Sequence, residues 1–200
     1  MLSIYSLQQK PNSAAELFGT TQAAPFPFIA NVASATRARE FVVARSSQAL
    51  HVGFRIEGKP NICPGSKPGD FREGLWSYDV VEVFLADSQS TRYEEFNFAP
   101  NGAWWWSAFS DYRVRDSSGG INRPQPEIVC GSDSIGWFVT VSINFVELQV
   151  DFRANSGERM NVCAIIGGLG VREHFSAASL DLQKPDFHRT EHFPSCVLVP

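Results

Sequence analysis

LWSYDVVEVFL (residues 75–85) and YEEFNFAPNGAWWWSAF (residues 93–109) stand close together in the middle of this chain. Both runs are rich in Val, Phe, Tyr and Trp, which pack well on a half-buried pleated surface. Val81, Val83 and Leu85 share one face of the first run, because successive side chains of a strand point to opposite faces. The Pro-Asn-Gly at residues 100–102 is a tight-turn signal. The block therefore predicts a meander of three strands.

Strand-like patterns continue on both sides of this block. Apolar side chains fall on every second position of LHVGFRI (residues 50–56), and the same alternation runs through GWFVTVSI (residues 136–143). Strands are also predicted at residues 41–45, 80–86, 93–98, 103–109 and 161–166. One short helix is expected at residues 33–39. Because Gly-, Pro- and Ser-rich loops separate the runs, we predict an all-β fold. It is a jelly-roll-like antiparallel β-sandwich of about ten strands with little helix, in a single domain over residues 1–200.

Charge and hydropathy narrow the range of partners. The formal net charge is −4, and Lys and Arg form no concentrated basic footprint, so we expect no binding to nucleic acid. No apolar run approaches the roughly 20 residues that cross a bilayer, so we expect no membrane partner. The first ten residues lack the pattern of a signal peptide, which predicts a cytoplasmic location, or a secreted one if a leader has been removed. The oligomeric state has no signal in the sequence.

The four cysteines are Cys63, Cys130, Cys163 and Cys196. They are widely spaced and form no CxxC pair, so neither a zinc site nor a thioredoxin-like motif is indicated. We interpret them as free thiols that act as small hydrophobic side chains.

The central block also resembles a known family. The pattern Leu-Trp-x-x-Asp-x-x-Glu-x-Phe-Leu is followed by Tyr-x-Glu-Phe-Asn-x-x-Pro-x-Gly-x-Trp and then by Tyr-Arg at residues 112–113. This is similar to the DOMON-like domains related to family 9 carbohydrate-binding modules. The Lys-Pro-Asp-Phe-His of residues 184–188, with Phe193 after it, resembles the way in which those domains end.

The resemblance implies an antiparallel β-sandwich that holds a sugar between aromatic side chains, with structural calcium nearby. Trp76 matches one aromatic wall, and Glu82, six residues later, matches a polar contact to sugar hydroxyls. No second aromatic wall is matched, because the chain has no Trp or Tyr after Trp137. Phe175, Phe187, Phe193 and the histidines remain. Loop Asp and Glu side chains are the candidates for calcium, although no EF-hand-like spacing is present.

The residues themselves point to the same region. Alternation sends Trp104 and Trp106 to one face of their strand and Trp105 to the other, so at least one indole must lie near solvent or in a second cluster. We expect Trp76 and one indole of the triplet to line a shallow cleft, together with Glu82 and Asn97 as hydrogen-bonding groups. The predicted ligand-binding residues are Trp76, Glu82, Asn97, Trp104, Trp106 and Arg113. The structural alternatives are a core Trp76 and a salt bridge from Glu82 to Arg113, Arg55 or Arg72.

Three chemical alternatives to binding alone have some support in the residues. Glycoside hydrolysis needs two carboxyl groups across the scissile bond, and Glu82 and Glu95 lie on neighbouring predicted strands. Some DOMON domains bind haem through Met and His, which here requires Met160. His188 and His192 have the spacing of a helical metal pair, but their context is loop-like. No GxSxG, P-loop or HExxH motif occurs.

We therefore predict a protein that is not an enzyme. The leading interpretation is a non-catalytic carbohydrate-binding module that holds a small sugar or a glycan end in an aromatic-lined cleft. The alternative is a DOMON-like ligand-sensing or protein-interaction domain that binds no sugar.

Overall fold

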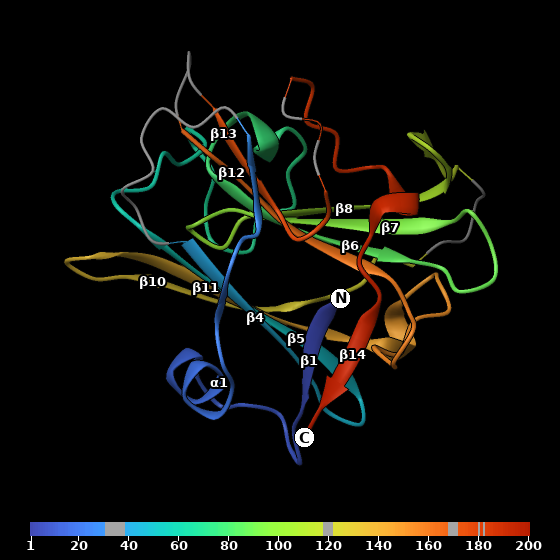
Figure 1. Ribbon diagram of the computed structural model, residues 1–200. Helices are drawn as coiled ribbons and strands as arrows, with labels where there is room; N and C mark the ends of the chain where they lie inside the picture. The colour runs from blue at the N-terminus through green and yellow to red at the C-terminus, as the bar shows by residue number, and fades with distance from the viewer. Residues whose placement is uncertain (31–38, 118–121, 168–171, 180, 182) are drawn as a thin grey trace.

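The computed structural model describes residues 1–30, 39–117, 122–167, 172–179, 181 and 183–200. Two seven-stranded sheets lie face to face (Figure 1). The first sheet has the order β10 (Glu127–Ser132), β11 (Gly136–Asn144), β5 (Ala49–Glu57), β4 (Arg39–Arg45), β1 (Leu2–Ser6) and β14 (Cys196–Val199), with β2 (Ala24–Pro25) also paired to β4. The second has the order β3 (Phe28–Ala30), β13 (Glu173–Ser176), β12 (Met160–Ile166), β6 (Val80–Ala86), β7 (Tyr93–Phe98), β8 (Trp104–Asp111) and β9 (Val114–Arg115).

The predicted β-sandwich is confirmed. The strands at residues 80–86 and 93–98 have the predicted bounds, and the others differ by one or two residues at an end. Most neighbouring strands are antiparallel, but β1 pairs in parallel with both β4 and β14. Figure 1 shows β1 and β14, from the two ends of the chain, side by side. The predicted strands did not include β1, β2, β3, β9, β10, β13 or β14, and β1 and β14 are short and lie far in sequence from their partners.

The helices are few and short. The predicted helix at residues 33–39 falls outside the described residues except for Arg39, which opens β4. An α-helix that was not predicted, α1 (Ala14–Thr20), begins after Ser13, whose Oγ accepts a hydrogen bond from the Glu16 backbone N–H at 3.1 Å. The Ser-x-x-Glu pattern is a capping-box signal that the sequence does carry. Single 3-10 turns complete the set: η1 (Leu75–Ser77), η2 (Phe145–Glu147) and η3 (Thr190–His192).

The main core fills the space between the two sheets. Val81, Val83 and Leu85 point into it from β6, as the alternation predicts, and each is fully buried. Trp104 and Trp106 point into the same core from β8. Met160 is fully buried there too, so other side chains enclose its thioether.

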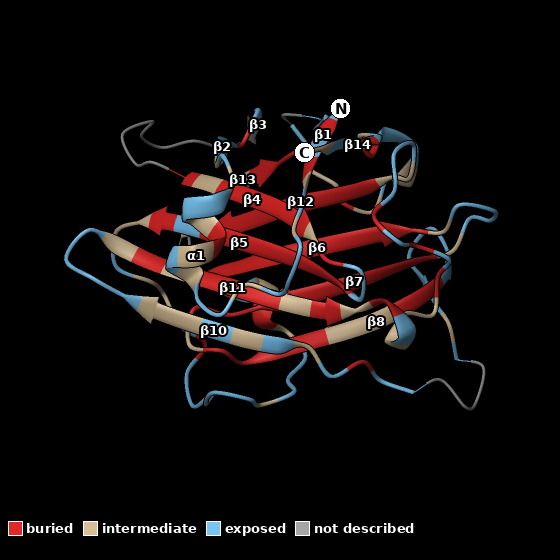
Figure 2. Ribbon diagram, turned by 90° about the horizontal axis from the view of Figure 1, so that it is seen from below, coloured by how far each residue is buried: buried red, intermediate tan, exposed pale blue. Residues whose placement is uncertain are grey.

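The outer face of the second sheet is also covered. Val80 and Phe84 of β6, Tyr93 of β7 and Trp105 and Phe109 of β8 form a second buried cluster with side chains from loops. Figure 2 shows that β6 and β7 are buried along their length, whereas β10 at the edge of the other sheet is largely exposed. Because loops cover this face, side chains on both faces of β8 are buried.

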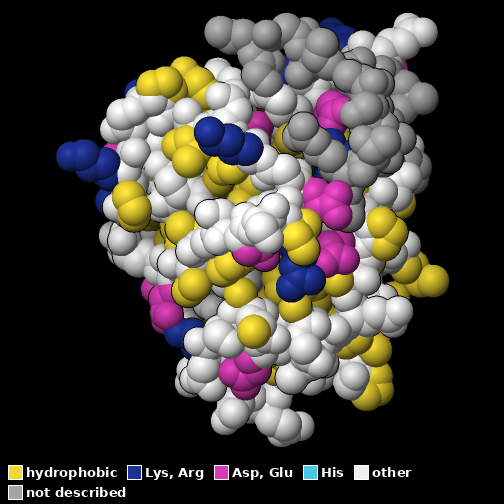
Figure 3. Space-filling view, turned by 90° about the vertical axis from the view of Figure 1, so that its left-hand side faces the viewer, with side chains coloured by type: hydrophobic (Ala, Val, Ile, Leu, Met, Phe, Trp, Pro, Cys, Tyr) yellow, Lys and Arg dark blue, Asp and Glu magenta, His cyan; other side chains and the backbone are white. Residues whose placement is uncertain are grey.

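The structure also bears on the expectations about the cysteines, membrane-spanning segments and surface charge. All four cysteines are free, and three of them are buried. No helix within the described ranges is long and apolar enough to span a membrane. On the face shown in Figure 3, Lys and Arg side chains mostly stand apart, between hydrophobic, acidic and neutral groups.

Candidate functional site

Four adjacent strands present polar side chains on the outer face of the second sheet. The strand register places Cys163 of β12 beside Glu82 of β6, Glu82 beside Asn97 of β7, and Asn97 beside Trp105 of β8. The next row along the strands includes Glu95, whose neighbour on β6 is Phe84. Because side chains alternate with a period of two, these rows share one face. Two carboxyl groups and an indole therefore meet on one surface.

Trp76 forms one wall above this surface. It lies in η1, after Gly74, whose φ of 86° is a left-handed conformation that suits glycine. The fully buried Leu75 anchors the turn. The Asp79 carboxylate fixes the loop further, because it accepts hydrogen bonds from the backbone N–H groups of Asn61 at 2.9 Å and Gly167 at 2.8 Å. The Trp76 ring meets the Trp105 ring edge-on, with centroids 5.2 Å apart.

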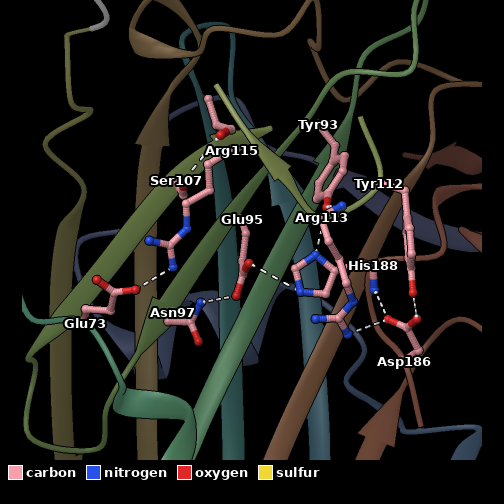
Figure 4. Close-up of polar contacts among 11 residues, drawn as sticks. Glu73, Tyr93, Glu95, Asn97, Ser107, Tyr112, Arg113, Arg115, Asp186 and His188 are labelled. Atoms are coloured by element: carbon pink, nitrogen blue, oxygen red, sulfur yellow. Dashed lines mark hydrogen bonds and ion pairs between the residues drawn. The ribbon is translucent and has the colours of Figure 1, made fainter. Parts of the chain in front are cut away.

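The opposite wall comes from the C-terminal part of the chain. Pro185, Phe187 and His188 border the same hollow as Trp76. The His188 Nδ1 is 2.8 Å from the Tyr93 hydroxyl, and its Nε2 is 3.7 Å from Oε2 of Glu95 (Figure 4). Tyr93 also accepts a hydrogen bond from the Arg113 backbone N–H at 3.0 Å. Its hydroxyl proton is then directed to His188 Nδ1, which leaves Nε2–H facing Glu95.

Two arginines complete the rim. Arg113, at a φ of 56°, donates from Nη2 to Asp186 at 2.8 Å. Arg115 pairs with Glu73, and its guanidinium carbon lies 4.9 Å from the centre of the Trp105 ring. Figure 4 shows both ion pairs on either side of Glu95. Each rim arginine has a carboxylate partner, so the pairs hold the rim in place while their guanidinium groups stay about half exposed.

These elements enclose a cleft of about 360 Å³. Its size lies at the lower end of the range for small-molecule sites. The cleft is lined by Trp76, Glu82, Glu95, Trp105, Phe109, Arg113, Arg115, Ile165, His174, Pro185, Phe187 and His188.

The two carboxyl groups at the floor of the cleft have few partners that stabilise their charged forms. Burial raises the pKa of Glu82 well above its usual value, and the nearby Glu95 carboxyl adds to the rise. Burial also raises the pKa of Glu95, to about 7, although Asn97 donates to its Oε1 at 2.7 Å. Burial lowers the pKa of His188 to about 4, so its imidazole is neutral at pH 7. No hydrogen bond to the Glu82 carboxyl is formed within the described part of the chain.

The buried Glu95 predicts a pH-dependent stability. An unfolded carboxyl titrates near 4.5 and the folded one near 7, so the folded protein holds more protons between these values and its free energy of unfolding falls as pH rises. Glu95→Gln removes this loss, and with it the part of the rise in the Glu82 pKa that the Glu95 carboxyl causes, which acts in the same direction. The variant should therefore gain up to about 3 kcal/mol relative to the parent as pH rises from about 4.5 to 8.

Urea denaturation of both proteins at a series of pH values measures this difference. His51 and His188, whose lowered pKa values act with the opposite sign, are present in both proteins, so their contributions largely cancel. A difference between variant and parent that does not change with pH would contradict the raised pKa of Glu95.

The structure brings three of the predicted site residues into the cleft: Trp76, Glu82 and Arg113. Asn97 is fully buried beside the floor, where its Oδ1 has no hydrogen-bond partner. Trp104 and Trp106 are not in the cleft, and their predicted placement there is wrong. Both face the core between the sheets, and Trp106 Nε1 donates to Glu94 at 2.7 Å. The indole of the triplet that lines the cleft is Trp105. Arg113 pairs with Asp186 and not with Glu82.

Several lining residues were not among the predicted site residues. Glu95 and Trp105 carry a signal, because they share the outward face with Glu82 and Asn97 once the strand register is known. Phe109 follows Trp105 at a spacing of four on the same strand. Phe187 and His188 belong to the Lys-Pro-Asp-Phe-His run and were among the side chains left open for a second wall, but only the folded structure places them opposite Trp76.

The described residues that line the cleft include no cluster of metal-binding side chains. Within the described ranges, no three His, Cys, Asp or Glu side chains converge on a point that could hold an ion. The calcium that the family resemblance implies stays a prediction. The histidine pair His188 and His192 lies around η3, a single 3-10 turn, and not on one face of an α-helix.

Comparisons with known proteins agree on the fold. No family model matches the chain, and neither does any curated protein sequence. Among solved structures, a protein of Bacteroides uniformis ATCC 8492, provisionally named as carbohydrate-binding, superposes with a TM-score of 0.72 at 15% identity, over 99% of this chain and 98% of that one.

A family 9 carbohydrate-binding module from Caldicellulosiruptor kristjanssonii superposes with a TM-score of 0.65 at 13% identity over 98% of this chain. Its structures contain glucose and cellotriose, and the matches cover 95% and 93% of those chains, respectively. At these identities the likeness shows that the chain has the fold of family 9 modules. The DOMON-like part of the resemblance stays a prediction.

Proposed function

We propose that this protein is a non-catalytic carbohydrate-binding module, and that a small sugar or a glycan end occupies the cleft beside Trp76. The observation that carries the proposal is the combination of aromatic walls with unpaired hydrogen-bond acceptors. Trp76 and Trp105 provide apolar surface, while the Glu82 carboxyl faces the cleft without a described hydrogen-bond partner. Buried polar groups are normally paired, so a group left unpaired in an open cleft favours a ligand that donates hydrogen bonds.

A pyranose ring has both surfaces that this cleft requires. Its C–H faces are apolar and pack on an indole, and its hydroxyl groups are donors as well as acceptors. The carboxyls of Glu82 and Glu95 would accept from hydroxyls, and the half-exposed guanidinium of Arg113 would donate to them. The shared fold with a module that holds glucose and cellotriose gives independent support.

The carboxyl pair favours binding over hydrolysis. A glycosidase needs one carboxyl with a raised pKa as the acid and a second that stays ionised as nucleophile or base. Here burial raises the pKa of both Glu82 and Glu95, so neither carboxyl of this pair has the lowered pKa that would keep it ionised as the nucleophile or base. We therefore expect no release of sugar from glycosides by the purified protein. Turnover that Glu82→Gln abolishes would contradict this.

Trp76→Ala is the direct test of the proposed site. Removing the indole should weaken sugar binding by roughly 1–3 kcal/mol, the range for losing a large aromatic contact. Trp76 is only partly buried, so the fold should remain intact. A screen of sugars by thermal shift finds a ligand, and calorimetry then gives the affinities of the parent and the variant.

Phe71→Ala is the matched control. Phe71 lies in the same loop, is 39% exposed and does not line the cleft. Its removal should leave sugar affinity unchanged. If the parent binds no sugar and Trp76→Ala lowers the melting temperature strongly, Trp76 is a core residue. The alternative, a ligand-sensing or protein-interaction domain without sugar binding, would then hold.

A further inference from the structure

A second hollow adjoins the cleft across a narrow ridge. It has a volume of about 360 Å³, and its walls include Tyr112, Asp181, Lys184 and Arg189. The ridge consists of two short pieces of chain, residues 112–113 in the turn between β8 and β9 and residues 184–189 near the C-terminus.

In each piece, adjacent residues line different hollows. Arg113 lines the cleft, whereas the preceding residue, Tyr112, lines the second hollow. Pro185 and Phe187 line the cleft, whereas Asp186 between them lines the second hollow. Because adjacent residues of each piece line different hollows, the ridge is a single chain thick at both places.

Asp186 joins the two sides of the ridge. One carboxylate oxygen accepts from Arg113 Nη2 at 2.8 Å, and the other accepts from the Tyr112 hydroxyl at 2.5 Å (Figure 4). The first oxygen also accepts from the His188 backbone N–H at 3.1 Å. These bonds fix the orientation of Tyr112 without burying it, and 46% of the residue stays exposed.

We propose that the second hollow is a subsite for a further sugar ring, so that the protein recognises an oligosaccharide whose chain crosses the Arg113–Asp186 ridge. This rests on the proposed function of the cleft. The ring of Tyr112 offers the platform for the sugar, with the guanidinium carbons of Arg113 and Arg189 at 5.8 Å and 5.6 Å from its centre. Lys184, which makes no side-chain hydrogen bond or ion pair within the described residues, offers a free donor.

The composition of the subsite suits hydroxyl groups better than a charged ligand. Arg189 is already paired with Glu191 at 2.8 Å, and Asp186 with Arg113. The Asp181 carboxylate caps the turn that follows it, with one oxygen 2.8 Å from the Gln183 backbone nitrogen. Arg189 and Asp186 are therefore neutralised by ion pairs, and Asp181 and Lys184 carry opposite charges, so the hollow has no excess charge of one sign and offers oxygen lone pairs and N–H groups to neutral partners.

Calorimetric titration with matched pairs of sugars tests the subsite. The probes are glucose with cellotriose, xylose with xylotriose, mannose with mannotriose, and N-acetylglucosamine with chitotriose. For the pair that binds, the trisaccharide should bind more tightly than the monosaccharide. Tyr112→Ala should weaken trisaccharide binding about three- to tenfold, the effect of losing one aromatic stack, and should leave monosaccharide binding unchanged.

Val114→Ala is the control variant. Val114 is 54% exposed, lies two residues from Tyr112 and lines neither hollow. Both affinities should survive this change. Equal affinity of the parent for the two members of the binding pair would overturn the subsite while the proposed function stands. Equal weakening of both by Tyr112→Ala would also overturn it, because Tyr112 would then act only through Asp186 on the cleft. Binding of none of the probes would contradict the proposed function, and the subsite with it.

Discussion

Replacing Glu94 with alanine is expected to lower the free energy of unfolding by about 4 kcal/mol, because one buried and two partly buried N–H groups lose their acceptor at once. Glu94 is fully buried. Its Oε2 accepts from Trp106 Nε1 at 2.7 Å, and its Oε1 accepts from the backbone N–H groups of Gln149 at 2.6 Å and Val150 at 3.0 Å. The carboxylate thus ties β8 to the segment that follows η2. Urea denaturation monitored by tryptophan fluorescence measures the loss.

Glu94→Gln is the matched variant. Its amide keeps one acceptor oxygen of the same reach, so the expected loss is smaller than that of alanine. A loss below about 1 kcal/mol for Glu94→Ala would mean that water takes over the three donors, and that the carboxylate does not hold this corner of the sandwich.

Trp105→Ala is expected to cost about 3–5 kcal/mol of stability, the range for truncating a large buried aromatic side chain. Trp105 is only 4% exposed and packs in the cluster on the outer face of the second sheet. Trp76 rests against it edge-on, and Arg115 lies over its ring. The change would remove the support beneath the wall of the cleft, so ligand binding should fall together with the melting temperature.

Trp105 and Trp76 separate the two roles of the aromatic wall. Trp105→Ala should reduce both stability and affinity, whereas Trp76→Ala should reduce mainly affinity. Trp105→Phe keeps an aromatic ring on the strand and should recover part of the stability. A Trp105→Ala protein with the melting temperature of the parent would show that the outer cluster contributes little to the fold.

The local alternation of apolar side chains was sufficient to predict the central strands. The runs at residues 80–86 and 93–98 form strands with those bounds, because alternation of apolar side chains and β-favouring residues act within a few positions. The same patterning correctly separated Val81, Val83 and Leu85 from Glu82. Among the strands that were not predicted, β1 and β14 are short and are held by partners from remote parts of the chain.

The sequence by itself determined the β-sandwich, the position of Trp76 and Glu82 in one block, and the division of the Trp triplet into two sets. Only the tertiary structure decided which of the two sets faces the core between the sheets and which faces the cleft. Period-two alternation states that Trp105 opposes Trp104 and Trp106, but it holds equally for either orientation of the strand. The orientation is set by pairing with β7, which places Trp105 beside Asn97 and opposite the inner core. The second wall at Phe187 and His188 arises for the same reason, because only folding brings residues so distant in sequence to one cleft.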